Sequence, residues 1–117
     1  MSQSCIFCRI VAGEIPAKLV YEDDAVVAFH DVHPQAPIHV LVVPREHVPS
    51  IAALSDANLE LAGRTMIAVG KVARAVGGLE NGFRVIVNNG PGAGQTVPHL
   101  HLHLLGGRQF SEGMVRE

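Results

Sequence analysis

The sequence predicts an α+β fold with a mostly antiparallel five-stranded sheet, and three observations lead to it. Five short segments have the apolar and β-branched residues of strands. The early segments follow one another through short links, as the strands of hairpins do. One long segment, 56–76, has apolar residues at three- and four-residue spacings, which indicates a single long helix. With a short helix at the start, the expected order is αβββαββ.

The first half of the chain is expected to hold the short helix and three strands. The helix is expected over 6–11, and Gly13 and Pro16 follow it. Strands are expected over 18–23 and 25–31, with Asp23 and Asp24 at the turn between them. A loop with two prolines leads to the third strand, over 39–44.

The second half is expected to hold the long helix and two strands. After a helical turn over 48–54, Ser55 is the expected N-cap, and Gly77 and Gly78 end the helix. The fourth strand is expected over 83–89, a glycine-rich loop over 90–96 and the last strand over 97–107. The helix stripe expected in the core consists of Leu59, Ala62, Met66, Val69, Val72 and Val76.

Length and composition exclude several classes of protein. The 117 residues suit one domain, 1–117, and 48% hydrophobic with 17% charged residues is typical of a globular chain. A net charge of −2 argues against a nucleic-acid partner. The chain has no apolar run of a spanning helix's length and no signal peptide, so no membrane association and a cytoplasmic location are expected.

The last expected strand, VPHLHLHLLGG, alternates histidine with leucine. Alternation is typical of a half-buried strand, so the histidines would lie about 6.7 Å apart on one face. Imidazoles in a row suit proton transfer or metal binding near neutral pH. One shared metal ion is disfavoured, because the three side chains would span about 13 Å. The core face would carry Leu100, Leu102 and Leu104, and the opposite face His99, His101 and His103.

The glycine-rich loop and the histidines together suit a phosphoryl group. Such loops can point backbone N–H groups at an anion, although a plain hairpin turn would also explain the glycines. A neutral imidazole is a competent nucleophile, and neighbouring imidazoles disfavour each other's protonation. His101, flanked on both sides, is the expected nucleophile. Its neighbours would hydrogen-bond the phosphoryl oxygens and pass a proton to the leaving group.

The segment HLHLHLLGGRQ resembles the signature of the histidine triad (HIT) family, and its Gly-Gly-Arg-Gln part resembles the Hint branch of nucleoside phosphoramidases. Segments 6–31, 34–44 and 88–108 resemble family segments in the family's order. The resemblance implies a HIT-like fold and a homodimer whose sheets join. It also implies a hydrolase that attacks the α-phosphorus of AMP or GMP derivatives, such as phosphoramidates or aminoacyl-adenylates. A nucleotidyl-histidine forms and is hydrolysed, and this chemistry requires no metal.

The resemblance assigns the site residues by position. His101 matches the nucleophile, His99 and His103 its partners, and His39 a fourth histidine of the proton network. Asp31 matches the carboxylate that binds the ribose. The apolar lining of the base pocket would comprise Phe7, Ile10, Phe29 and Val32; the phosphate would lie near Asn88, Gln95, Thr96 and Val97, and Gly94 would orient the nucleophile.

Cys5 and Cys8 have the spacing of a paired metal site, although two small buried residues would also explain them. Some bacterial relatives bind structural zinc with such a pair, and the resemblance makes His47 and His99 the other ligands. Two thiolates and two imidazoles suit tetrahedral zinc. One nitrogen of His99 would then bind the metal while the other faces the phosphate.

Two alternatives to a nucleotidyl hydrolase stay open at this point. A dinucleoside polyphosphate hydrolase of the Fhit-like branch is the first, and the Gly-Gly-Arg-Gln segment argues against it. The second is a nucleotide-binding regulatory partner protein whose catalysis is incidental.

Overall fold

The computed structural model describes residues 5–115; the ends of the expected domain, 1–4 and 116–117, lie outside the described residues. The expected order of helices and strands is confirmed. Within residues 5–115, three short 3-10 turns, labelled η, accompany them. The elements are α1 (Ile6–Val11), β1 (Leu19–Glu22), β2 (Val26–His30), β3 (Ile38–Pro44), η2 (Ile51–Ala53), η3 (Asp56–Asn58), α2 (Leu59–Val76), β4 (Arg84–Ile86), η4 (Pro91–Ala93) and β5 (Leu102–Gly106).

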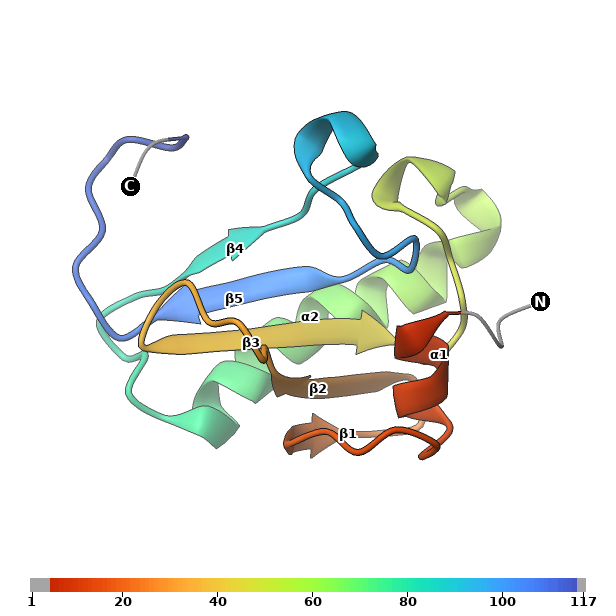
Figure 1. Cartoon of the computed structure of the whole chain (residues 1–117), viewed down its shortest axis with the longest axis horizontal. Helices are drawn as coiled ribbons and strands as arrows, with labels where there is room; N and C mark the ends of the chain where they lie inside the picture. The colour runs from red at the N-terminus through yellow and green to blue at the C-terminus, as the bar shows by residue number, and fades with distance from the viewer. Residues whose placement is uncertain (1–4, 116–117) are drawn as a thin grey trace.

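The five strands form one antiparallel sheet in the order β1-β2-β3-β5-β4 (Figure 1). The last strand of the chain therefore lies between β3 and β4. In the β3–β5 register His39 lies opposite Leu105, and Leu41 lies opposite His103. Side chains two residues apart on a strand share a face. The register thus brings His39 and His103 to the same face of the sheet.

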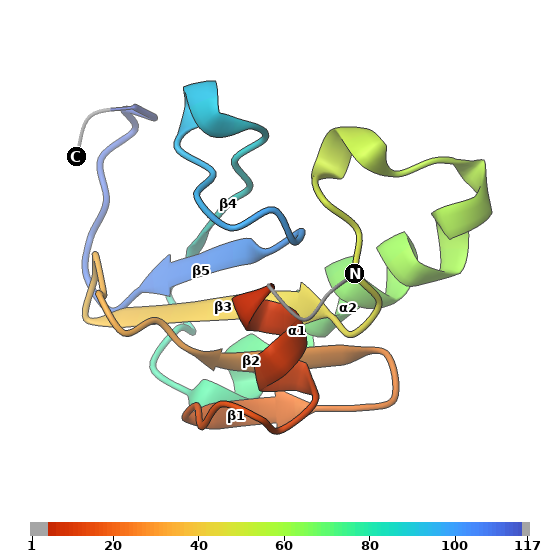
Figure 2. The same cartoon turned by 45° about the vertical axis from the view of Figure 1, so that its right-hand side comes forward.

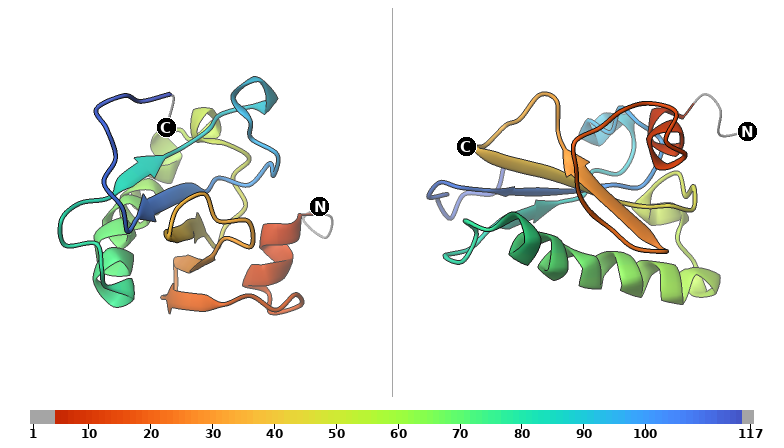
Figure 3. Two further views of the ribbon diagram at one scale, coloured as in Figure 1. Left: turned by 60° about the vertical axis from the view of Figure 1, so that its left-hand side comes forward. Right: turned by 90° about the horizontal axis from the view of Figure 1, so that it is seen from below.

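The two helices cover opposite faces of the sheet, as Figures 2 and 3 show. α2 packs on one face over a core that includes Val26, Val40 and Leu104. On the other face, Phe7 of α1 packs on Phe29 and the neighbouring apolar residues of β2 and β3. Because α1 is short, it covers only part of this face, and the rest is open for a site.

The prediction for the last strand is correct for its leucines and wrong for its length. Leu100, Leu102 and Leu104 are buried in the α2-side core. The strand begins only at Leu102, because the chain bends over residues 97–99. Pro98 has no N–H for a strand ladder.

The long helix also differs from the prediction. Ser55 caps the η3 turn, whose capping box includes Asn58, and the α-helix begins only at Leu59. Leu59 and Met66, expected in the core, are 74% and 63% exposed. The buried positions are the expected Val69 and Val72, together with Thr65, Ala68 and Ala73, which the stripe did not include. The packed face is therefore rotated away from the predicted stripe.

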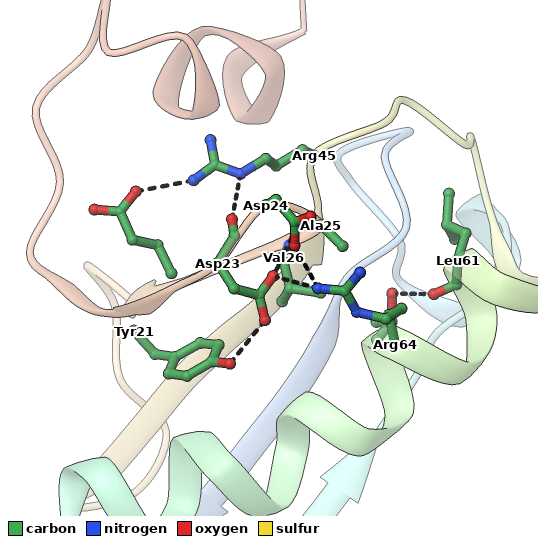
Figure 4. Close-up of polar contacts among 10 residues, drawn as sticks. Tyr21, Asp23, Asp24, Ala25, Val26, Arg45, Leu61 and Arg64 are labelled. Atoms are coloured by element: carbon green, nitrogen blue, oxygen red, sulfur yellow. Dashed lines mark hydrogen bonds and ion pairs between the residues drawn. The ribbon is translucent and has the colours of Figure 1, made fainter.

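The β1–β2 turn is fixed by Asp23, shown in Figure 4. Its Oδ1 atom accepts hydrogen bonds from the N–H groups of Ala25 and Val26, both at 2.8 Å, and Oδ2 accepts one from the Tyr21 hydroxyl at 2.7 Å. Arg64 of α2 pairs with Asp23 at 3.5 Å and also with Asp24. This cluster joins the turn to α2. Within residues 5–115, no helix is both long and apolar enough to cross a membrane.

Candidate functional site

An open cavity of about 1040 Å3 lies on the α1 side of the sheet. Its walls come from α1, the segment 15–18, the end of β2, the loop that follows it, and β3. Most of the nucleotide-site residues expected from the sequence line it. They are Phe7, Ile10, Phe29, Asp31, Val32, Thr96, Val97, His101 and His103. His39, expected in the proton network, lines it as well.

Three expected phosphate-site residues, Asn88, Gly94 and Gln95, do not line this cavity. Gln95 instead stabilises the glycine-rich loop. Its Oε1 atom accepts the N–H of Gly90 at 2.7 Å, and its Nε2 atom donates to the carbonyl oxygens of Pro49 and Val97. A side chain with these three bonds has little capacity left for a phosphate.

The glycines of this loop meet a backbone requirement. Gly90 and Gly94 have φ values of +87° and +90°, which other residues rarely adopt. Asn89, which the sequence analysis did not select, ties the loop to η2, because its Oδ1 atom accepts the N–H of Ala52 at 2.8 Å. The loop is thereby tied to η2, and its last residue, Thr96, lies with Val97 at the cavity wall.

His101 is buried, and one of its ring nitrogens is committed. Its Nδ1 atom lies 2.7 Å from the carbonyl oxygen of His99. A carbonyl only accepts hydrogen bonds, so in the neutral ring Nδ1 carries the proton and Nε2 has the free electron pair. The ring of Phe7 contacts the His101 ring edge-on, with centroids 5.0 Å apart. His101 lines the cavity, and this arrangement fixes the orientation of its ring and of the Nε2 electron pair.

His39 and His103 form a hydrogen-bonded pair beside His101. The N–H of Gln35 donates to Nδ1 of His39 at 2.9 Å, so the proton of neutral His39 is on Nε2. That Nε2 lies 2.9 Å from Nδ1 of His103 and 3.4 Å from Oδ2 of Asp31. His103 accepts at Nδ1 and therefore carries its own proton on Nε2.

Burial keeps this pair neutral. Desolvation lowers the pKa of His39, opposed by the carboxylate of Asp31. Desolvation, together with the neighbouring His101 and His39, lowers the pKa of His103 to about 4. Both histidines are therefore neutral near pH 7, and His103 can donate a hydrogen bond but holds no extra proton to release. That a neighbour of His101 passes a proton to the leaving group stays a prediction.

Asp31, His39 and His103 also form a compact group of metal-ligand types. A metal would need a free electron pair on Nε2 of His39, but the Gln35 N–H occupies Nδ1 and keeps the proton on Nε2. The hydrogen bond between the two histidines accounts for their short separation. This group is a hydrogen-bonded chain rather than a metal site.

Cys5, Cys8, His47 and His99 bring four metal-ligand atoms together within 4.8 Å of one another. His99 Nδ1 lies 3.4 Å from both sulfur atoms and 3.2 Å from His47 Nδ1, and Cys8 Sγ lies 3.2 Å from His47 Nδ1. A tetrahedral zinc site with two sulfur and two nitrogen ligands has edges of about 3.3–3.8 Å. The four residues expected to bind zinc therefore fit it in number, type and spacing.

His99 is fully buried, and its second ring nitrogen does not face the cavity. Nε2 lies 2.8 Å from the carbonyl oxygen of Pro44, so it donates a hydrogen bond there. The expectation that this nitrogen faces the phosphate is wrong, because it is bonded to the Pro44 carbonyl and His99 does not line the cavity. Its backbone serves the site instead, through the bond to His101. A carbonyl partner on the second nitrogen is typical of metal-bound histidines.

Lys18, His30 and His33 also line the cavity, although no motif marks them. His30 and His33 flank Asp31 in the chain, and Lys18 is joined to His30 by a backbone hydrogen bond of 3.1 Å. All three side chains are exposed at the rim. Proximity to Asp31 is the only sequence signal that could have selected the two histidines.

The fold and this site define a class: an α+β protein with paired histidines over an apolar cavity beside a cysteine–histidine cluster. Residues 12–110 match the HIT domain family, and the chain belongs to it. An uncharacterized HIT-like protein of Synechocystis is 47% identical over 111 residues, covering 95% of this chain and 96% of that protein. The resemblance to the family is thereby confirmed.

Two further relatives bear on the two parts of the site. The structure of a HIT family hydrolase from Legionella pneumophila superposes with a TM-score of 0.87 at 46% identity, covering 92% of this chain and 96% of that chain. A 14 kDa zinc-binding protein of maize (Zea mays) is 44% identical over 108 residues, covering 91% of this chain and 84% of that protein. The HIT-like fold expected from the sequence is confirmed by the structural match.

Proposed function

We propose that this protein is a hydrolase that cleaves purine nucleoside phosphoramidates, or related AMP and GMP derivatives such as aminoacyl-adenylates, at the α-phosphorus. The observation that carries the proposal is the hydrogen bond from His101 Nδ1 to the His99 carbonyl, which places the electron pair of the neutral ring on Nε2 of a residue that lines the cavity. The hydrolase name of the Legionella relative supports the reaction type. The Gly-Gly-Arg-Gln segment supports the Hint branch.

The cavity suits a purine nucleotide. Phe7, Ile10 and Phe29 supply apolar walls for a base, and aromatic edges contribute to such contacts. Val32 is 85% exposed at the rim, and a bound base would cover it. Asp31, partly buried beside His39, would accept hydrogen bonds from the ribose hydroxyl groups. The α-phosphate would then lie near His101 and Thr96.

The reaction would proceed in two steps. The electron pair of His101 Nε2 forms a bond to phosphorus while the bond from phosphorus to the leaving nitrogen breaks, and this nitrogen takes up a proton from solvent as it leaves. The products of this step are a nucleotidyl-histidine and a free amine, and the second step returns a proton to solvent. Water then attacks the phosphorus and releases His101. Over both steps one water is consumed: its hydroxyl stays on phosphorus, and its hydrogen ends on the released amine. The imidazole itself is the nucleophile, so the proposed steps need no metal.

His103 would stabilise the phosphoryl oxygens. Its neutral ring presents the Nε2–H group, because Nδ1 accepts from His39. A donor aimed at developing negative charge stabilises the transition state. His39 fixes the tautomer and orientation of His103, and the N–H of Gln35 fixes those of His39. These three residues thus act as one hydrogen-bonded unit.

We also propose a structural zinc ion on Cys5, Cys8, His47 and His99. The four converging ligand atoms and the zinc-binding name of the maize relative support it. With all four positions filled by protein, no site remains for an activated water. Zinc here would stabilise the protein and take no part in the chemistry.

The quaternary state and location stay predictions. We propose one domain over 1–117 and a homodimer; exposed Val85 and Ile86 on the edge strand β4 support pairing with a second copy. We expect a cytoplasmic protein without nucleic-acid or membrane partners.

The proposed activity is tested by comparing initial rates on an adenosine phosphoramidate and on a diadenosine polyphosphate. Faster release from the phosphoramidate is expected. Preference for the polyphosphate would favour the Fhit-like alternative. Tight AMP binding without turnover of either compound would identify a nucleotide-binding regulatory protein.

A further inference from the structure

His99 connects the cysteine–histidine cluster to the candidate nucleophile. Its ring nitrogen Nδ1 lies among Cys5, Cys8 and His47, and its backbone carbonyl accepts the bond from His101. We propose that the metal-filled cluster holds His101 in its reactive orientation, so that Cys5, Cys8 and His47 are positioning residues for the nucleophile. This inference rests on the proposed function and deepens it.

The carbonyl of His99 lies outside the strand ladder. The pairing of β5 with β3 runs only from Leu102 to Gly106, and residues 97–99 form a bend. Two backbone bonds hold this segment, from His99 N–H to the Val97 carbonyl at 2.8 Å and from Leu100 N–H to the Val48 carbonyl at 2.7 Å. Neither bond fixes the direction of the His99 carbonyl as a full ladder would.

The His99 side chain supplies the missing constraint. Its Nε2 is held by the Pro44 carbonyl at the end of β3, and its Nδ1 points into the cluster. A ring held at both nitrogens fixes the torsions of its residue. With the cluster empty, only the Pro44 bond remains, and the ring and the backbone behind it gain freedom.

A second connection runs through α1. Cys5 caps this helix, Cys8 lies within it, and Phe7 between them contacts both rings, with centroids 5.0 Å from His101 and 6.0 Å from His99. The cluster therefore positions Phe7 against the nucleophile as well. Both connections act on the same ring.

The best test variant is His47→Gln. His47 is the exposed ligand, lies on the loop after β3 and does not line the nucleotide cavity. The matched control is Arg64→Ala, which removes the ion pairs with Asp23 and Asp24 at the far side of the sheet and leaves the cluster intact (Figure 4). Both variants remove structural contacts, but only His47→Gln is expected to loosen His99.

Four quantities are measured on zinc-loaded wild type and both variants: metal content, kcat and KM on an adenosine phosphoramidate, the Kd of AMP, and the 15N resonances of the His101 ring. In His47→Gln we expect lost metal, kcat lower by about 10- to 100-fold and AMP Kd within about threefold. The 15N resonances of the His101 ring should move from the values of a single tautomer toward the average of the two tautomers. Arg64→Ala should lower the melting temperature and leave kcat and these resonances unchanged.

Retained kcat, or unchanged His101 resonances, in metal-free His47→Gln would overturn the proposal. If this variant does not fold or keeps its metal, wild type stripped with a chelator and reloaded with zinc provides the same comparison. If wild type neither binds AMP nor cleaves the phosphoramidate, the proposed function fails, while the His101 resonances with and without zinc still decide the positioning role.

Discussion

The Nε2 atom of His39 lies 2.9 Å from the Nδ1 atom of His103, across the boundary between β3 and β5. The N–H of Gln35 at the opposite nitrogen of His39 makes this bond directional. One proton arrangement therefore holds for both rings. It depends on both remaining neutral, and burial secures this by lowering the pKa of each.

Stability should therefore decrease in mild acid partly through His103. The pKa of a histidine in the unfolded chain is about 6.5, whereas that of His103 in the folded protein is about 4. Between these values the unfolded chain binds a proton that the folded protein does not, so the free energy of unfolding falls as pH falls. The free energy of unfolding of wild type should be higher at pH 7 than at pH 5. His103→Asn should reduce this difference measurably, by an amount below about 3 kcal/mol.

Urea unfolding of wild type and variant at both pH values measures this difference. Asparagine keeps an acceptor near the Nδ1 position, so the His39 bond is retained. His33→Asn, at the exposed rim, controls for the loss of any histidine. If the free energy of unfolding changes by the same amount between pH 7 and pH 5 in wild type and in His103→Asn, the prediction is contradicted.

His101→Ala should lower kcat on a phosphoramidate by at least about a thousandfold, because the covalent route is lost. AMP binding should remain measurable, since the apolar walls and Asp31 are untouched. Intact-mass measurement of a rapidly quenched wild-type reaction should show a nucleotidyl adduct that the variant lacks. Near-normal turnover by the variant would mean that another group is the nucleophile.

Asp31→Ala should lower kcat/KM by about 10- to 100-fold on ribonucleotide substrates, because a hydrogen bond to a charged group contributes about 1.5–3 kcal/mol. The loss on 2′,3′-dideoxy analogues should be much smaller. Asp31 Oδ1 also accepts the N–H of His33 at 2.8 Å, and Asp31→Asn keeps that bond as a control. Equal losses on both substrates would assign Asp31 to the loop rather than to the ribose.

Protein purified without chelator should contain close to one zinc per chain, and Cys5→Ser with Cys8→Ser should contain almost none. A ligand that binds only the folded state stabilises it by about 4 kcal/mol at a thousand times its Kd. Chelator should therefore lower the melting temperature of wild type and leave that of the double variant unchanged. A metal-free wild type with no response to chelator would make the cysteines ordinary core residues.

Asp23→Ala should cost about 1–3 kcal/mol of stability, because it leaves the N–H groups of Ala25 and Val26 and the Tyr21 hydroxyl without their acceptor. Desolvation raises the pKa of Asp23, but hydrogen bonds from Tyr21, Ala25 and Val26 outweigh it and lower the pKa overall. The stabilisation from Asp23 is therefore fully present above the pKa of an aspartate in the unfolded chain, about 3.9. It is lost as the pH falls from there through the lower pKa of the folded protein. Asp24→Ala, at a residue bound to Arg64 and 84% exposed in its side chain, is the control in urea unfolding.

The sequence predicted the fold well where local patterns determine structure. Alternation identified the buried Leu100, Leu102 and Leu104, since burial on one face imposes a period of two. It failed at His99, because a bend stabilised by contacts with Pro44 and the cysteines depends on residues distant in the chain. The helix stripe failed at Met66 because neighbouring apolar residues define two overlapping faces, and only packing selects one.

The site shows the same division between local and distant information. The glycine-rich loop and the histidine row indicated phosphoryl chemistry from the residues alone. His39 and Asp31 came only from the family resemblance, because their neighbourhood with His103 is created by the β3–β5 register. No pattern within either segment encodes that register, and none indicated that Gln95 would bond to the loop backbone.

The position of β5 in the sheet determines the order in which the protein can assemble on the ribosome. A nascent chain releases β1, β2 and β3 first, and β3 keeps an open hydrogen-bonding edge until β5 emerges. β4 emerges earlier than β5 but pairs with no other strand of the described sheet. At about 5–20 residues per second, the β3 edge stays open for seconds. Cys5 and Cys8 wait even longer for His99, so the proposed metal site and the cavity can be completed only after His99 and β5 have emerged.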